Sequence, residues 1–125
     1  MPRRVAPQGE DQEILAGPPL LVLTSLVSGP KHGHALMKDI EGFAMIRLGP
    51  GTLYGAIARL EAQGLITPLP ADGPRRPYEI SPQGATVLKA SIDELGRVVA
   101  EGQSRLHALQ RERRFIVPAL RGGGV

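Results

Sequence analysis

Apolar residues recur along this chain at the spacing of helices, and glycine and proline separate one segment from the next. Residues 20–28, LLVLTSLVS, are apolar almost all round. They predict a buried helix that Pro18-Pro19 opens and Gly29-Pro30 ends. A second helix is predicted over residues 34–42, with apolar side chains on one face and charged ones on the other. Residues 1–17 lack sustained periodicity, so we expect a flexible arm there.

A third helix is predicted over residues 50–63, with Gly64 as its C-terminal stop. Its apolar residues Leu53, Ile57 and Leu60 follow one another at steps of four and three. Residues at these steps lie on one face of a helix, so we expect this stripe to face the core. The opposite face is left open and carries mostly small or polar residues.

The period changes after the third helix. Residues 65–70, LITPLP, are short and rich in proline, which confines them to an edge strand. Asp72-Gly73 is a turn dipeptide, and residues 75–80, RRPYEI, alternate like a returning strand with Tyr78 and Ile80 inward. Two short strands joined by a small loop predict a hairpin.

A long amphipathic helix is predicted over residues 82–110, with Ser81 as its cap and Pro82 in its first turn. Its apolar positions follow steps of three and four: Ala85, Leu88, Ile92, Leu95, Val99, Gly102, Leu106 and Leu109. Such a heptad seam is typical of helices that pair with another helix. The stripe is too long for a small domain to cover, so we expect a homodimer held by Leu88, Ile92, Leu95, Val99, Leu106 and Leu109.

These elements predict a mainly α fold with a small β-hairpin, in the order α-α-α-β-β-α. The second and third helices meet at a glycine- and proline-rich break, as in a helix-turn-helix unit, and the hairpin that follows has the place of a wing. We therefore expect a winged helix-turn-helix domain over residues 18–81, a dimerisation helix over residues 82–115 and a flexible tail over residues 116–125. The cluster Arg111, Arg113 and Arg114 is compatible with an extended dimer helix, a DNA contact or a solvated end.

Composition narrows the function further. The chain has 125 residues, the size of a single domain, and no cysteine for a disulfide framework or a thiolate metal site. No apolar run approaches the roughly 20 residues of a membrane helix, and no signal peptide is evident, so we expect a cytoplasmic protein. The net charge of +3 is too small to establish nucleic-acid binding by itself. With two tyrosines, two phenylalanines and no tryptophan, few rings are available to stack a planar ligand.

The sequence offers few candidates for catalysis or metal binding. His32-x-His34 has no cysteine and no carboxylate at ligand spacing, which does not favour a metal site. Gly49-Pro50-Gly51 lacks the spacing and the lysine of a phosphate loop. No Ser/His/Asp or paired-carboxylate arrangement stands out. We therefore expect neither an enzyme nor a cofactor or metal.

Four motifs resemble the PadR family of bacterial transcription regulators. They are LLVLTSLVSGPKHGHALMKDI, LGPGTLYGAIARLEAQGLI, RRPYEISPQG and the long helix that follows, in that order. The resemblance implies a dimeric winged-helix repressor or local regulator that often responds to a small molecule. It also places the His-Gly pair in the turn entering the second helix. Two departures are Gly49, where a serine is frequent, and the absence of tryptophan, which some drug-responsive relatives use in their pockets.

The residues expected to bind double-stranded DNA lie on the second and third helices and on the hairpin. Thr52 and Arg59 lie on the open face of the third helix and can reach bases or phosphates. The resemblance suggests that Tyr54 contacts DNA, although a core position is the alternative. Arg75 and Arg76 on the hairpin and Lys38 on the second helix are the remaining residues expected to bind DNA.

For the arginines, structural roles without DNA contact remain as alternatives. Arg59 can pair with a glutamate, and Arg75 and Arg76, as arginines on an exposed loop, can be only solvated. The competing function is a winged-helix protein-interaction module without DNA binding, which the net charge of only +1 over residues 31–80 supports. A small-molecule carrier is a third class, against which the scarcity of aromatic residues argues.

Overall fold

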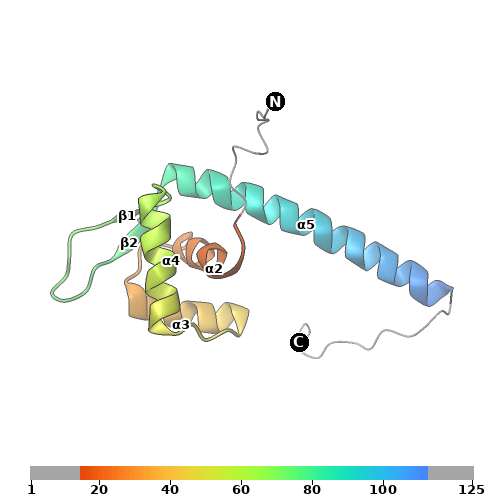
Figure 1. Cartoon of the computed structure of the whole chain (residues 1–125), viewed down its shortest axis with the longest axis horizontal. Coiled ribbons are helices and arrows are strands. Elements are labelled where there is room, and N and C mark those ends of the chain that lie inside the picture. Colours follow the sequence, from red (N-terminus) through yellow and green to blue (C-terminus); the bar gives the residue numbers. More distant parts are fainter. Residues whose placement is uncertain (1–14, 113–125) are drawn as a thin grey trace. The chain divides into compact units, whose positions relative to one another are not determined.

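A computed structural model of the chain describes residues 15–112, and its elements are labelled in Figure 1. In order they are α2 (Gly17–Leu26), α3 (Gly33–Ala44), α4 (Pro50–Ala62), β1 (Ile66–Pro68), β2 (Tyr78–Ile80) and α5 (Pro82–Arg111). The strands pair antiparallel, with Ile66 opposite Ile80 and Pro68 opposite Tyr78. The predicted fold class, mostly helical with a small hairpin, is confirmed.

The chain divides into two compact units, residues 1–92 and residues 93–125. The division falls within α5. Residues 1–14 and 113–125 lie outside the described part, and with them most of the expected arm, the expected tail, Arg113 and Arg114. Within the described residues no helix combines the length and the apolar character that a membrane span requires.

The core of residues 1–92 is built around α2, which contacts both α3 and α4. Because α2 is apolar on nearly all sides, it can be enclosed by its neighbours, as the sequence predicted. The largest fully buried apolar side chains come from these three helices: Leu23, Leu26, Leu36, Ile40, Leu53 and Leu60. Leu15, which lies within the arm expected over residues 1–17, is also buried.

The end of α2 comes a turn earlier than Gly29-Pro30 predicted. Val27, Ser28 and Gly29 each donate a backbone hydrogen bond to a carbonyl three residues back, which tightens the last turn. The ammonium of Lys31 then donates to the Ser25 carbonyl at 2.5 Å and to the Ser28 hydroxyl at 2.7 Å. Lys31 therefore stabilises the negative end of α2.

The hairpin strands are shorter than predicted, with three residues each. Pro68, Pro70 and Pro77 have no N–H to donate, which limits the ladder. Strand β2 also pairs with a residue outside the hairpin, because Tyr78 forms an isolated bridge with Lys31. The N–H of each residue donates to the carbonyl of the other, at 3.1 and 3.0 Å. The hairpin is thus attached to the connection between α2 and α3, a contact that the sequence did not predict.

The start of α5 is fixed to the end of α4 by Ser81. Its hydroxyl accepts from the Gly84 N–H at 3.0 Å, which is the predicted cap, and donates to the Gly64 carbonyl at 2.7 Å. Its own N–H donates to the Leu65 carbonyl at 3.0 Å. Gly84 comes so close to this turn that a Cβ on it would lie 2.9 Å from Ile80 Cγ1 and nearer still to the Leu65 carbonyl oxygen.

The apolar stripe of α5 is covered at its beginning only. Gly84, Leu88 and Ser91 are buried, and the Ser91 hydroxyl accepts from the Leu15 N–H at 2.9 Å. Leu88 belongs to the core of residues 1–92. It was predicted at the dimer interface, and its side chain is already buried within the chain.

Candidate nucleic-acid interface

Helix α4 has one buried face and one exposed face. Leu53, Ile57 and Leu60 are buried as predicted, and Ala56 joins them. The exposed face carries the predicted residues Thr52, Tyr54 and Arg59, together with small residues: Gly51, Gly55, Ala58 and Ala62. The helix begins after Gly49, which provides no side-chain cap. A face of this kind lets a helix backbone come close to a groove.

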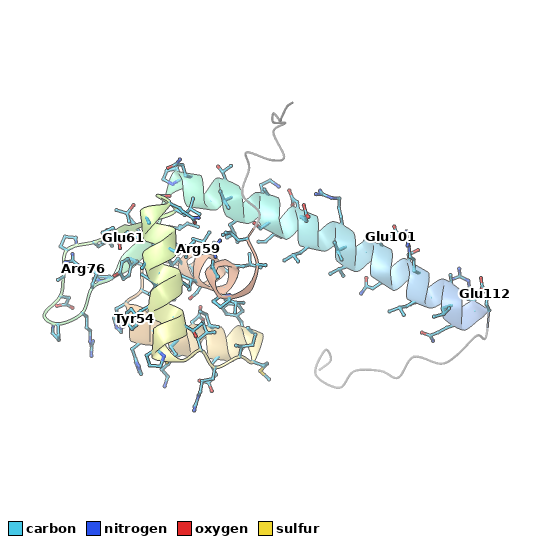
Figure 2. The ribbon with its side chains drawn as sticks, viewed as in Figure 1. Tyr54, Arg59, Glu61, Arg76, Glu101 and Glu112 are labelled. Atoms are coloured by element: carbon cyan, nitrogen blue, oxygen red, sulfur yellow. The ribbon has the colours of Figure 1, made fainter. Side chains whose placement is uncertain are left out.

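Polar side chains flank the exposed face on both sides. Figure 2 shows Arg59 and Glu61 on opposite sides of α4, with Glu61 toward the hairpin. Thr52 lies two turns before Arg59 on the same flank, and Tyr54 occupies the Glu61 flank near the start of the helix. The two predicted base-reading residues therefore share a flank, and Tyr54 lies on the other.

Tyr54 rests on the first turn of α3. Its side chain is 52% exposed, yet its hydroxyl lies against Gly33 so closely that a Cβ there would lie 2.6 Å from its Cζ. The ring therefore packs on the domain while one side stays open to solvent. The core position that was the alternative therefore describes part of this side chain, and its contact with DNA stays a prediction.

The hairpin tip is a tight turn that displays both wing arginines. Asp72 and Arg75 exchange two backbone hydrogen bonds, at 2.7 and 3.1 Å, around Gly73, whose φ is +62°. A positive φ at this place in a turn is favoured by glycine and suits the twist of a hairpin. Arg76 donates from Nη1 to the Leu69 carbonyl at 2.8 Å, so part of its guanidinium holds the two sides of the loop together.

A hollow of about 200 Å³ lies between the start of α3, the start of α4 and the hairpin. We call it the α3–hairpin hollow, and its lining residues are His32, Gly33, His34, Tyr54, Pro74, Arg75, Arg76 and Tyr78. It brings three predicted DNA-binding residues together from two elements: Tyr54, Arg75 and Arg76. The two histidines were not predicted to bind DNA. From the sequence, the His-x-His pair was considered as a metal motif and as part of the turn entering the second helix.

A second hollow of about 420 Å³ lies between α3 and the start of α4. Lys38, the remaining predicted residue, is exposed and lines it together with His34, Glu41 and Arg47. Arg47 and Glu41 form an ion pair at 3.5 Å, and both side chains are well exposed, so this pair adds little to stability. Lys38 is thus separated from the wing arginines, although His34 borders both hollows.

The imidazole of His32 caps α3. Its Nδ1 accepts from the Ala35 N–H at 3.4 Å, which leaves Nε2 to carry a proton. Among residues 15–112 no three side chains of the ligand types His, Cys, Asp and Glu gather as a metal site would require. Tyr78 is half-buried, and burial, followed by the charge of Glu61, raises the pKa of its hydroxyl. Its phenol therefore keeps its proton at neutral pH.

The exposed part of the α5 stripe carries the other predicted dimer residues. Ile92, Leu95, Val99 and Leu106 are between 42% and 54% exposed, and Leu109 is half-buried. Val98 is more exposed than any of these, although the heptad pattern did not select it. A further group of exposed apolar residues lies at the end of α3 and in the loop after it: Phe43, Met45 and Ile46.

The sequence of residues 22–90 matches the model of the PadR-like family of transcriptional regulators. This chain belongs to that family. A PadR family transcriptional regulator from Eggerthella lenta is 31% identical, with a TM-score of 0.58 over 70% of this chain and 79% of that structure. The family resemblance found in the sequence is thereby confirmed. PadR-like regulators as a class are generally not enzymes.

Two curated relatives differ in how much of their length this chain spans. A transcriptional regulator of Mycobacterium tuberculosis is 35% identical over 91 residues, which are 68% of this chain and 84% of that protein. A 37.1 kDa protein in transposon TN4556 of Streptomyces fradiae is 44% identical over 79 residues. These cover 63% of this chain but only 23% of the transposon protein.

Proposed function

We propose that this PadR-like regulator binds double-stranded operator DNA as a homodimer and represses transcription from it. The observation that carries the proposal is the α3–hairpin hollow, which gathers Tyr54, Arg75 and Arg76 beside the exposed face of α4. In winged-helix and related proteins such a helix enters the major groove, while neighbouring basic side chains contact the backbone.

Each element has a distinct role in this proposal. The small residues of α4 allow a close approach to the groove, and Thr52 and Arg59 on its flank contact base edges. Arg75 and Arg76 contact phosphates or the minor groove, where arginine is well suited to bind. Lys38, exposed on α3, contacts a further phosphate. In this proposal the contacts to DNA come from three elements: α3, α4 and the hairpin.

The exposed stripe of α5 supports the homodimer. A single winged helix makes few base contacts, and two copies that read two half-sites raise both affinity and specificity. Ile92, Leu95, Val99, Leu106 and Leu109 are the interface residues in this proposal. The proposal also includes a response to a small-molecule effector, and only the family resemblance supports this part.

The deciding experiment is a gel-shift titration with DNA from upstream of the gene that encodes this chain. Binding of that DNA with a clear preference over a scrambled duplex of the same composition is the expected result. If neither duplex is bound, the protein-interaction module becomes the better explanation. The net charge of only +1 over residues 31–80 makes this comparison worthwhile.

A further inference from the structure

Building on the proposed DNA binding, we propose that the α3–hairpin hollow is a subsite for one backbone phosphate. In this subsite the Tyr54 hydroxyl, His34 and the wing arginines donate to the phosphate. Gly33 is the positioning residue, because the Tyr54 hydroxyl occupies the space that a Cβ at residue 33 would fill.

The chemistry of the lining residues points to an anion. The hollow is lined by two guanidinium groups, two imidazoles and two phenols, and no carboxylate is among its lining residues. All of these polar groups can donate hydrogen bonds, and an imidazole presents an N–H donor in either protonation state. The larger hollow between α3 and α4 differs in this respect, because Glu41 lines it and is paired with Arg47.

The size of the hollow favours a phosphate over a larger group. Its volume of about 200 Å³ is below the range of roughly 300–1,000 Å³ that is usual for pockets of drug-sized ligands. Because it is open on one side and combines residues of a helix start and a hairpin, it can receive one phosphate of a continuous strand. Such a contact fixes the position of the protein on DNA and carries no sequence information.

One of the arginines is already held in place. The bond from Arg76 Nη1 to the Leu69 carbonyl, at 2.8 Å, restrains the guanidinium before any ligand binds. A guanidinium has five N–H donors, so further donors remain for a phosphate. Restraint of this kind reduces the entropy that is lost on binding.

The position of Tyr54 depends on Gly33. A Cβ at residue 33 would lie 2.6 Å from Tyr54 Cζ and 3.0 Å from Cε1, and it would meet the hydroxyl oxygen first. Gly33 is not among the residues with positive φ, so its backbone does not require glycine. The need for glycine at this position therefore comes from Tyr54. An alanine there would push the hydroxyl out of the hollow.

The test uses full-length protein and a duplex that the protein itself selects from a random-sequence pool. Single phosphates of this duplex are replaced, one at a time, by neutral methylphosphonates. Wild-type protein is expected to lose roughly ten- to hundredfold in affinity at one phosphate of each half-site, as for a hydrogen-bonded charge. In Tyr54→Phe and in His34→Gln, replacement of that same phosphate is expected to cost much less. His107→Gln, an exposed histidine of α5, serves as the matched control and keeps the wild-type profile.

Gly33→Ala tests the positioning role. It is expected to reduce the loss at that one phosphate as Tyr54→Phe does, while losses at the other phosphates stay as in wild type. In a Tyr54→Ala background, Gly33→Ala is expected to change DNA affinity no further, because the collision is gone. A purely structural role would instead weaken binding at every phosphate. If Gly33→Ala does not fold, the Tyr54→Phe and His34→Gln profiles still decide the subsite.

Two results distinguish failure of the subsite from failure of the proposed function. If the selected duplex is bound but the phosphate profile is the same in wild type, Tyr54→Phe and His34→Gln, the subsite is wrong and DNA binding stands. If the protein selects no duplex from the pool, the proposed function is wrong, and the subsite fails with it.

Discussion

At the scale of single residues, Gly33 and Gly84 each allow two elements to meet. Gly84 brings the first turn of α5 against Leu65 at the entry to β1 and against Ile80 at the end of β2. Neither glycine has a positive φ. Glycine is needed at both positions because neighbouring atoms would collide with a Cβ. The backbone conformation does not itself require glycine.

We expect Gly84→Ala to lower the free energy of unfolding by about 1–3 kcal/mol, as overpacking in a tight core does. The added methyl group would meet the Leu65 carbonyl oxygen, which belongs to the backbone and cannot turn away. Urea denaturation followed by circular dichroism measures the change. Gly96→Ala in the same helix is the control, because its added Cβ meets nothing within 4 Å beyond its chain neighbours and the backbone of its own helix. It is expected to stabilise the chain by about 0.5–1 kcal/mol through helix propensity. Equal effects of the two substitutions would contradict the collision.

Met45 follows α3 in the left-handed conformation, with φ of +58°, and its side chain is exposed. A long side chain in this conformation is strained, whereas glycine adopts it readily. Met45→Gly is therefore expected to stabilise the domain by about 0.5–1 kcal/mol, seen as a higher melting temperature in calorimetry. Ala44→Gly, one residue earlier and within the helix, is expected to destabilise it by a similar amount. A lower melting temperature for Met45→Gly would show that the strain is not significant.

At the scale of elements, the apolar stripe of α5 is buried in one part and exposed in another. The part that includes Leu88 and Ser91 is buried in the core, and the part from Ile92 to Leu106 is exposed. The heptad pattern is the same in both parts. Periodicity is a local property and identifies the stripe, but only the tertiary fold decides which part is already covered.

Replacing Leu95 and Val99 with aspartate places charges in the middle of the exposed stripe. If this stripe is the dimer interface, the buried charges cost several kcal/mol and the dimer dissociates. Light scattering is expected to report a monomer, and operator affinity falls with it. Ala100→Asp with Ser104→Asp is the control, since it has the same spacing on the opposite side of α5. A stable dimer for the Leu95 and Val99 variant would exclude this stripe as the main interface.

Local signals predicted the helices, the Asp72-Gly73 turn and the Ser81 cap, because each depends on neighbours within a few residues. The bridge between Lys31 and Tyr78 was missed, because a single pair distant in the sequence leaves no periodic pattern. The α3–hairpin hollow was missed for a related reason. Tyr54, Arg75 and Arg76 were predicted one by one on α4 and the hairpin, whereas the place of Gly33 beside Tyr54 depends on how α3 and α4 pack.

At the scale of the whole molecule, α4 and the hairpin make two kinds of contact in the proposed complex. Contacts from α4 to base edges distinguish one DNA sequence from another, and contacts from the hairpin to the backbone do not. Substitutions in the two elements therefore have different effects on specificity and on salt dependence.

Arg59→Ala is expected to reduce the discrimination between operator and scrambled DNA by about 1–3 kcal/mol. Arg75→Ala is expected to weaken binding to both duplexes equally and to reduce the salt slope by about 0.9 for each phosphate that the arginine neutralises. Arg75 is the cleaner choice on the hairpin, because Arg76 also bonds to the Leu69 carbonyl. Titrations at several salt concentrations measure both quantities. An unchanged salt slope for Arg75→Ala would mean that this arginine is only solvated.

The hydrogen bonds of Ser81 connect three elements of this domain directly. One residue holds the turn after α4 through Gly64, the entry to β1 through Leu65 and the first turn of α5 through Gly84. Because these bonds meet at one residue, we expect a change in the direction of α5 at its beginning to move the end of α4 and the entry to β1 as well. In the proposed complex, such a change would alter the orientation of α4 on the DNA.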